Sequence, residues 1–292
     1  MTAKKGLSTR VQHIMPSGIR KIFDLACQNP DGFDLSIGDP DFDIPAPIKD
    51  AGIEWIKKGF NHYVSTRGIP ELREKIARHL NSRKVNFGDI LITAGATGAY
   101  YLAILAVASP GDEILIADPY FVAYANVVIM CGGVPRFFNT YPDFKLRADE
   151  ILPLITPKTK AIVINNPGNP TGVVYSKQEL QMIAGIAKEY GIHVISDEIY
   201  DEFTYGDIPF ISMGNLIEDA IVISGFSKRA AMTGWRLGYV SGPKIVIDAM
   251  ATLQQYSYVC ANSIAQKAAL TALDYDIQPY VNRYLNRRNM VY

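Results

Sequence analysis

The chain has 292 residues, and its 29 lysines and arginines balance its 29 aspartates and glutamates, so the formal net charge is zero. A balanced charge argues against a nucleic-acid footprint or a polybasic membrane surface. Apolar residues make up 48% of the chain and charged residues 20%. This composition is typical of a globular protein with a sizeable core, and the length suits one large domain or two modest ones.

The composition also predicts a cytoplasmic location. No apolar segment of the signal-peptide kind follows the polar N-terminus, and the longest apolar run, residues 99–108, is too short to cross a bilayer. We interpret that run as a buried helix. The three cysteines, Cys27, Cys131 and Cys260, lie far apart without metal or redox spacing, which indicates buried thiols in a reducing compartment.

In chain order, a polar arm (residues 1–18) and a helix over about 18–28 are expected first. A short strand and a turn follow at 34–42, where Gly38 and Pro40 force the chain to change direction. Prolines 45 and 47 begin a helix that runs to about residue 59, and Pro70 opens another over 71–83. Strands and helices then alternate to the end of the chain.

Several of the later strand candidates are continuous apolar runs, such as Ala161-Ile-Val-Ile. Strands of this kind are covered on both faces, which predicts a mostly parallel sheet. We therefore expect an α/β fold with a seven-stranded sheet and helices on both faces. The strands are expected at 89–93, 113–117, 133–137, 161–165, 193–196, 220–224 and 238–242, and the helices at 97–108, 121–131, 177–190, 244–250, 263–273 and 276–292.

The stretch from Ser224 to Tyr239 carries the clearest chemical signal. Lys228 follows a buried strand within a glycine-flanked, nearly uncharged segment, and Arg236 comes eight residues later. Burial lowers the pKa of a lysine, and a partly neutral amine can attack a carbonyl to form a Schiff base. A surface lysine on a loop is the ordinary alternative, and the neighbouring residues argue against it.

This stretch resembles the lysine signature of the class I/II aminotransferases, pyridoxal-phosphate enzymes of fold type I. The resemblance covers nearly the whole chain, with its motifs in the expected order. It implies that Lys228 binds the cofactor as a Schiff base and that Arg236 clamps the cofactor phosphate, for which a planar guanidinium is well suited. Many members have a serine three residues before the lysine, where this chain has Gly225. Ser224 and Ser227 are therefore both candidates for the phosphate.

Other motifs supply the remaining groups that the cofactor needs. Asp197, at the end of a buried strand, matches the aspartate that faces the pyridine nitrogen, and Tyr200 matches the tyrosine at the phenolic oxygen. A helix cap is the alternative role for this aspartate. Asn169, in the Asn-Pro-Gly-Asn-Pro-Thr-Gly loop, resembles the asparagine that binds the same oxygen and approaches the substrate carboxylate.

The phosphate cradle is expected at Gly95, Ala96 and Thr97, in a strand-to-helix turn whose backbone amides form an anion site. This turn matches neither a dinucleotide fingerprint nor a Walker A loop. Phe121 matches the aromatic residue that stacks on the cofactor ring, and Tyr120 is the alternative.

Two further residues follow from the resemblance. Tyr63 resembles the tyrosine that reaches the phosphate of the partner subunit, which implies a homodimer with shared sites. Gly38 lies in the segment that folds over the substrate. We predict no metal site, because the four histidines lack ligand spacing and the aspartates at 39, 41 and 43 lack the rest of a calcium loop.

We therefore expect a pyridoxal-phosphate-dependent aminotransferase that moves an amino group between an amino acid and a 2-oxo acid by a ping-pong mechanism. A lyase or synthase on the same apparatus, or a cofactor-binding domain without turnover, are the alternatives. The resemblance divides the chain into an N-terminal arm with part of the small domain (1–45) and a large cofactor-binding domain (46–292). It also implies that most of the C-terminal small domain is missing, together with the arginine that grips the substrate α-carboxylate.

Overall fold

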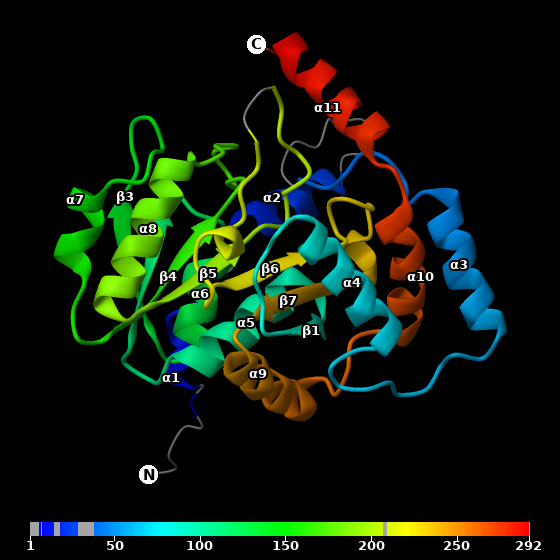
Figure 1. Cartoon of the computed structure of the whole chain (residues 1–292), viewed down its shortest axis with the longest axis horizontal. Coiled ribbons are helices and arrows are strands. Elements are labelled where there is room, and N and C mark those ends of the chain that lie inside the picture. Colours follow the sequence, from blue (N-terminus) through cyan, green and yellow to red (C-terminus); the bar gives the residue numbers. More distant parts are fainter. Residues whose placement is uncertain (1–5, 7, 15–17, 29–37, 207–208, 292) are drawn as a thin grey trace.

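A computed structural model describes residues 6, 8–14, 18–28, 38–206 and 209–291. Within these residues one seven-stranded sheet has the strand order β1-β7-β6-β5-β4-β2-β3 (Figure 1). Strand β7 is antiparallel to both of its neighbours, and the other pairings are parallel, which confirms the expected mostly parallel sheet. The strands are β1 (Asp89–Thr93), β2 (Glu113–Asp118), β3 (Val134–Asn139), β4 (Thr159–Asn165), β5 (His193–Asp197), β6 (Ile221–Gly225) and β7 (Gly238–Gly242).

Helices surround this sheet on both faces (Figure 1). The helices of the first half are α1 (Thr9–Gln12), α2 (Gly18–Ala26), α3 (Ala46–Lys57), α4 (Pro70–Ser82), α5 (Gly95–Val107), α6 (Ala123–Met130) and α7 (Ala148–Ile151). Those of the second half are α8 (Lys177–Tyr190), α9 (Lys244–Ser257), α10 (Ser263–Asp274) and α11 (Gln278–Val291), with short 3-10 turns at Leu152–Leu154, Met213–Asn215 and Thr233–Trp235.

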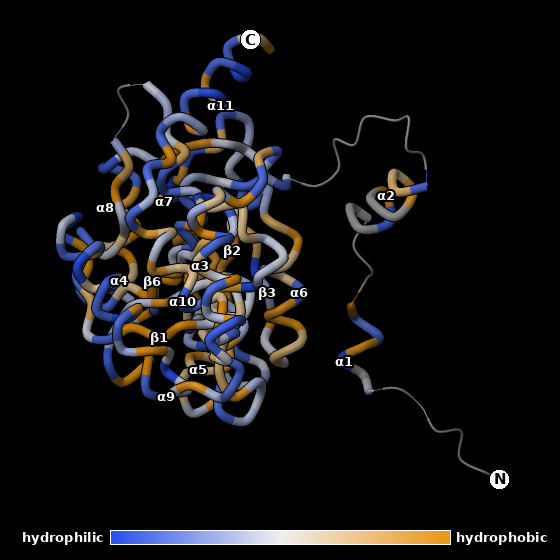
Figure 2. Tube along the Cα trace, turned by 90° about the vertical axis from the view of Figure 1, so that its right-hand side faces the viewer, coloured by the Kyte–Doolittle hydropathy of each residue, from blue (hydrophilic) through white to orange (hydrophobic). Residues whose placement is uncertain are grey.

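Successive residues of the central strands face opposite layers of helices, as the pleat of a strand requires. One layer, formed by α5, α6 and α9, packs on Val163, Ile195 and Ile223. The opposite layer, with α8, packs on Ile162 and Val222. The strands are thus covered on both sides, which explains their continuous apolar sequences. The orange strands in the interior of Figure 2 show the same burial.

A third apolar cluster closes the edge of the sheet at β1 and β7. It joins α3, α4 and α10 to that edge through Ile48, Ile76, Ile92 and Ala268. Leu72, Ile76 and Leu80 form the buried face of α4 in this cluster. This cluster matters for function because the loop between α3 and α4, residues 58–69, lies over it.

Local signals in the sequence set the ends of α8. The Ser176 hydroxyl accepts a hydrogen bond from the backbone of Glu179, and the Glu179 carboxylate accepts one from the backbone of Ser176, which forms a capping box. Gly191 ends the helix in the left-handed conformation with φ 64°. These caps account for the observed bounds of α8, which match the helix expected at residues 177–190.

Two expectations differ from the structure, and a third falls on residues that the structure does not describe. Helix α9 continues to Ser257 rather than ending near Met250, because Ala251 and Gln254 extend its buried face. Cys27 is exposed and Cys131 and Cys260 are only half-buried, so the prediction of three buried thiols is wrong. The strand expected at residues 34–36 lies outside the described residues.

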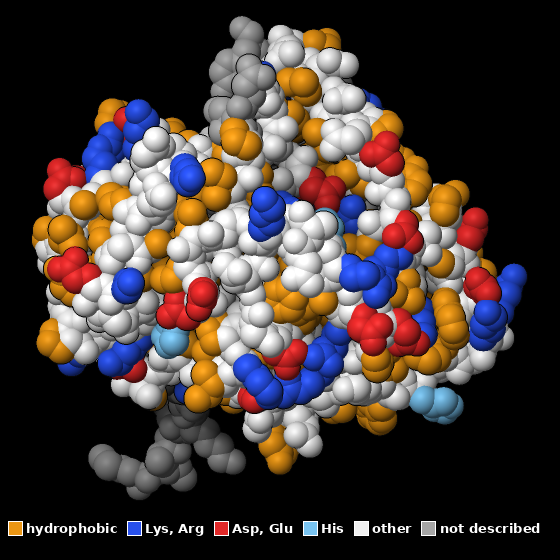
Figure 3. All heavy atoms as spheres, viewed as in Figure 1, with side chains coloured by type: hydrophobic (Ala, Val, Ile, Leu, Met, Phe, Trp, Pro, Cys, Tyr) orange, Lys and Arg blue, Asp and Glu red, His pale blue; other side chains and the backbone are white. Residues whose placement is uncertain are grey.

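The N-terminal helices project to one side of the sheet-and-helix body (Figure 2). On the face shown in Figure 3, basic and acidic side chains are interspersed rather than gathered into patches of one sign. No helix in the described part of the chain has the length and apolar character needed to cross a membrane.

Candidate active site

The predicted site residues follow the carboxyl ends of neighbouring strands. Asn165, at the end of β4, pairs with Asp197 at the end of β5, and Asp197 pairs with Ile223 of β6. The loops that leave these strand ends therefore begin at one edge of the sheet, where ligands bind in open α/β folds. This register brings Asp197 into the electrostatic environment of Lys228.

Asp197 is a buried carboxylic acid with a defined hydrogen-bond partner. Its Oδ2 accepts a hydrogen bond from the Tyr124 hydroxyl at 2.8 Å, and its Oδ1 accepts one from the backbone amide of Ile199 at 3.2 Å. Burial raises the pKa of Asp197, while these two bonds and the charge of Lys228 oppose the rise. A cation placed beside this carboxyl would favour its ionised form.

The asparagine loop is fixed to the same strand end. The side chain of Asn165 donates to the backbone carbonyl of Asp197 at 3.0 Å and accepts from the backbone amide of Asn169 at 2.7 Å. The side chain of Asn169 in turn is hydrogen bonded to the Tyr200 hydroxyl, and burial raises the pKa of Tyr200 to about 12. Tyr200 is therefore a protonated donor near neutral pH, as a partner for a phenolic oxygen would require.

Lys228 follows β6 and is half-buried. Its Nζ donates to the carbonyl of Gly38 at 2.6 Å and lies 5.6 Å from the centre of the Tyr200 ring. Burial lowers the pKa of Lys228, the charge of Arg236 lowers it further, and Asp39 and Asp197 oppose this change. The structure thus brings Lys228, Gly38, Tyr200 and Asp197 together, and it favours the neutral amine that nucleophilic attack needs.

The phosphate cradle and Arg236 form one unit. Gly95, with φ +74°, begins α5, and a Cβ on it would lie 2.7 Å from Nη2 of Arg236. A Cβ on Gly238 would lie 2.7 Å from the amide nitrogen of Ala96. The guanidinium, held by a bond from Nη1 to the Thr233 carbonyl at 2.8 Å, therefore lies against the free amides at the start of a helix.

The structure separates the two candidate serines. Ser224 lies on the face of β6 opposite Ile223, and its hydroxyl is hydrogen bonded to Tyr239. The bond to Tyr239 directs the Ser224 hydroxyl away from the layer that contains Asp197, so Ser227 is the better candidate for binding the phosphate. The glycine at position 225 has a steric explanation, because a Cβ there would lie 2.9 Å from the Cα of Gly238.

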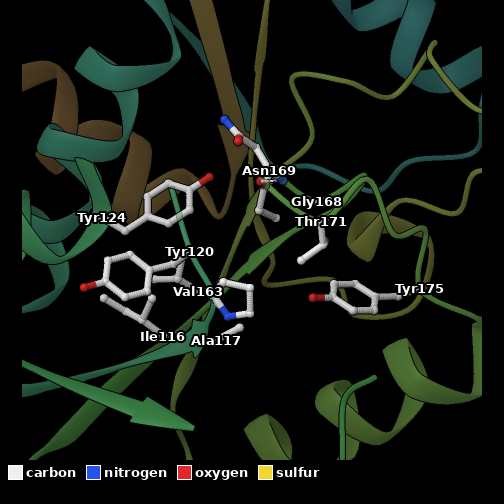
Figure 4. A pocket seen from close by; sticks show the side chains of 11 residues that line it. Ile116, Ala117, Tyr120, Tyr124, Val163, Gly168, Asn169, Thr171 and Tyr175 are labelled. Atoms are coloured by element: carbon white, nitrogen blue, oxygen red, sulfur yellow. Dashed lines mark hydrogen bonds between the residues drawn. The ribbon is translucent and has the colours of Figure 1, made fainter. Parts of the chain in front are cut away.

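The two aromatic residues that are candidates for stacking on the cofactor ring have different neighbours. Tyr120 stacks on Phe137 of β3, with 4.9 Å between ring centres, whereas Phe121 makes an edge contact with Tyr124 at 5.6 Å. Phe121 therefore contacts the residue that binds Asp197. In Figure 4 a small cavity lies between Tyr120 and Tyr124 on one side and Asn169 and Thr171 on the other.

Sequence reasoning missed several residues of this region. Tyr124 comes three residues after Phe121. Residues at this spacing lie on the same side of a helical segment, so the spacing could have identified Tyr124. Tyr258 is distant in sequence but accepts a hydrogen bond from the backbone amide of Ala94, just before the cradle, at 3.2 Å. No pattern in the neighbouring sequence predicts this hydrogen bond. Tyr256, two residues before Tyr258, is 85% exposed.

Tyr63 lies apart from the residues just described. It is 83% exposed and projects from the loop between α3 and α4. The described residues contain no group of three His, Cys, Asp or Glu side chains that could hold a metal ion. Asp41, one of the three clustered aspartates, instead forms ion pairs with Arg283 and Arg287 of α11.

Comparison with known proteins agrees with this geometry. The family model for aminotransferase class I and II matches residues 30–290. The chain is 42% identical to an aspartate aminotransferase of Pyrococcus abyssi, covering 91% of this chain and 71% of that protein. It is 39% identical to the aromatic-amino-acid aminotransferase 2 of Thermococcus litoralis, covering 98% and 77%. The crystal structure of an aspartate aminotransferase from Thermotoga maritima superposes with a TM-score of 0.91 at 34% identity, covering 98% and 79%.

The fold and site define an enzyme of fold type I that uses pyridoxal phosphate. The chain belongs to the class I and II aminotransferases, and it is a pyridoxal-phosphate-dependent aminotransferase. Aminotransferases of this family use amino acids and 2-oxo acids as substrates.

The residues of this chain fit that cofactor. Arg236 and the helix start at Gly95 lie in contact, so one guanidinium and several free amides can bind a single phosphate. Asp197 is a buried acid at the same edge of the sheet, and Lys228 supplies an amine with a lowered pKa. The phosphate, the ring nitrogen and the aldehyde carbon of the cofactor thus each have a complementary group in this chain.

Proposed function

We propose that Lys228 holds pyridoxal phosphate covalently in this chain and that Asp197 pairs with its ring nitrogen while amino groups move between an amino acid and a 2-oxo acid. The observation that carries this assignment is the placement of these two residues. The lysine has a lowered pKa, the acid is buried, and each lies within the electrostatic reach of the other.

When bound, pyridoxal phosphate supplies an electron sink for negative charge at the substrate α-carbon. The chain supplies the positioning. Asp197, held by Tyr124, keeps a negative charge beside the ring nitrogen, and two unit charges about 4 Å apart attract by about 4 kcal/mol at an effective dielectric near 20. Tyr200 and Asn169 donate to the phenolic oxygen, and Phe121 packs against the ring.

The phosphate is assigned to Arg236, Ser227 and the amides of residues 95–97. We assign the proton transfer to Lys228. Its Nζ, in the neutral form that burial favours, takes the α-proton of the substrate and later returns it at the carbon that accepts the amino group. Gly38, whose carbonyl contacts this Nζ, lies where a substrate would be covered.

We also propose that the enzyme is a homodimer in which Tyr63 of one subunit reaches the phosphate of the other. The support is the exposure of Tyr63, since an aromatic side chain that is 83% exposed has few contacts within its own chain. The cytoplasmic location and the boundary at residue 45, just before α3, are further parts of this proposal.

A two-part assay tests the reaction. The purified protein, supplied with pyridoxal phosphate, is incubated with an amino acid with and without 2-oxoglutarate. We expect glutamate to form only with the 2-oxo acid, in parallel-line kinetics typical of a ping-pong mechanism. Release of pyruvate or ammonia without a 2-oxo acid would instead favour a lyase.

A further inference from the structure

A single buried glutamine connects the backbone before α5 to the loop that carries Tyr63. Gln254, near the end of α9, is completely buried. Its Nε2 donates to the carbonyl of Thr66 at 2.6 Å and to the carbonyl of Ile92 at 2.9 Å, and its Oε1 accepts from the Tyr258 hydroxyl at 2.7 Å. Both of its donor hydrogens and one acceptor position are therefore used.

One branch of this network leads to the cradle of the same subunit. The Tyr258 hydroxyl that donates to Gln254 accepts a hydrogen bond from the backbone amide of Ala94 at 3.2 Å. Ala94 is the residue immediately before α5, whose first turn is the expected phosphate cradle. The Gln254–Ile92 bond fixes the end of β1 two residues earlier. The network thus holds the backbone on which the cradle is built.

The other branch leads to the loop that carries Tyr63. Gln254 binds this loop at the Thr66 carbonyl, three residues after Tyr63. The next residue, Arg67, forms ion pairs with Asp89 and Asp248, and its carbonyl accepts from the amide of Ile92 at 3.1 Å. The loop is therefore fastened to β1 and α9 while Tyr63 itself projects outward.

We propose that Gln254 is a positioning residue shared by the two cofactor sites of the dimer. Through Tyr258 and Ile92 it holds the phosphate cradle of its own subunit, and through Thr66 it holds the loop whose Tyr63 completes the cradle of the partner. This inference rests on the proposed shared site. A displacement of Gln254 disturbs both phosphate sites at once, because one amide group bonds both segments.

Heterodimers with one functional lysine test this inference. Two differently tagged chains are co-expressed, and one carries Lys228→Ala so that only the other subunit binds the cofactor covalently. The measured quantity is the dissociation constant of pyridoxal phosphate at the remaining lysine, from its visible absorbance. Each further substitution is placed either in the subunit that holds the measured site, in cis, or in the other subunit, in trans.

Gln254→Met keeps the size of the side chain and removes its hydrogen bonds. We expect it to raise the dissociation constant about fivefold or more in trans as well as in cis, the effect of losing roughly one hydrogen bond. Tyr258→Phe is the matched control, because it removes the bonds of the hydroxyl to Ala94 and to Gln254 Oε1 but leaves both bonds from Gln254 Nε2, to Thr66 and to Ile92. It should weaken binding in cis and leave binding unchanged in trans.

The outcomes separate this inference from the shared site itself. If Tyr63→Phe weakens binding in trans and Gln254→Met in trans does not, the shared site stands and the role of Gln254 is refuted. If neither substitution weakens cofactor binding in trans, the proposed sharing of the site between subunits is wrong, and the inference about Gln254 fails with it. Should the methionine variant fail to assemble, Gln254→Asn, which is too short to reach both carbonyls, takes its place with the same expectations.

Discussion

The Tyr124 hydroxyl donates a 2.8 Å hydrogen bond to Oδ2 of Asp197. Both side chains are buried, and burial raises the pKa of Tyr124 well above its ordinary value. The phenol therefore stays protonated near neutral pH, and it remains a donor when Asp197 is ionised. This arrangement favours the charged carboxylate that a protonated ring nitrogen needs.

Replacing Tyr124 by phenylalanine should weaken this acid without unfolding the site. A hydrogen bond to a charged group contributes roughly 1.5–3 kcal/mol, so we expect kcat to fall by about tenfold or more while cofactor binding changes less. Tyr100→Phe is the control, because Tyr100 is buried nearby but its hydroxyl donates to a backbone carbonyl. Equal reductions of kcat by the two substitutions would contradict a specific role for Tyr124.

Asp197→Ala should reduce turnover far more than it reduces cofactor binding. The phosphate and the covalent link at Lys228 hold the cofactor in the absence of the acid, whereas the ring loses the charge that makes it an electron sink. Separate measurement of kcat and of the dissociation constant of pyridoxal phosphate tests this expectation. Near-normal kcat in the variant would refute the role of Asp197.

Gly95→Ala should impair the cradle beyond its cost to the backbone. A methyl group there meets Arg236 Nη2 at 2.7 Å, and the φ of +74° adds about 1 kcal/mol of strain. Gly191→Ala is the control, because its φ is +64° and a Cβ would meet no atom within 4 Å. Both variants should lose similar stability in urea unfolding.

Only Gly95→Ala should also weaken the binding of pyridoxal phosphate and of inorganic phosphate, which competes for the same cradle. Isothermal titration with each ligand measures this difference. If the Gly191 and Gly95 variants bind both ligands equally well, the contact between Arg236 and the helix start has no part in phosphate binding.

Glu198 makes the stability of the fold depend on pH. Burial raises its pKa to about 7 from an ordinary value near 4.5, although the amide of Met213 and the hydroxyls of Ser196 and Ser212 donate to it. Between these two pH values the folded chain retains a proton that the unfolded chain has lost. This contribution to stability therefore falls as the pH rises from about 4.5 to 7.

Glu198→Gln keeps the shape of the side chain and an oxygen that accepts those bonds, but it carries no charge. We expect the variant to be more stable than the parent above pH 7, by on the order of 2–3 kcal/mol, with a smaller difference at pH 5. Urea unfolding at pH 5 and pH 8 gives both values. A difference that does not change with pH would exclude titration of Glu198.

The sequence predicted those features that depend on short-range patterns. Apolar runs identified the strands, and prolines marked the starts of α3 and α4. The order of strands along the sheet and the antiparallel β7 have no such pattern, because they depend on pairings between residues distant in the chain. The end of α9 was missed for the same reason, since Gln254 is buried by contacts with Thr66 and Ile92.

For the site, motifs located the residues that we propose to contact the cofactor but not the residues that hold them in place. Asn165, Tyr124 and Tyr258 support the predicted residues through single hydrogen bonds across the fold. Likewise, the sequence left Ser224 and Ser227 undecided. The alternation of β6, visible only once its neighbours are known, directs Ser224 toward Tyr239.

The most direct test concerns Lys228 itself. We expect Lys228→Ala to abolish the visible absorbance of bound pyridoxal phosphate and its covalent retention after borohydride reduction. Lys177→Ala, at the exposed first position of α8, should change neither. A Lys228→Ala protein that still retains the cofactor covalently after reduction would contradict the assignment on which this account depends.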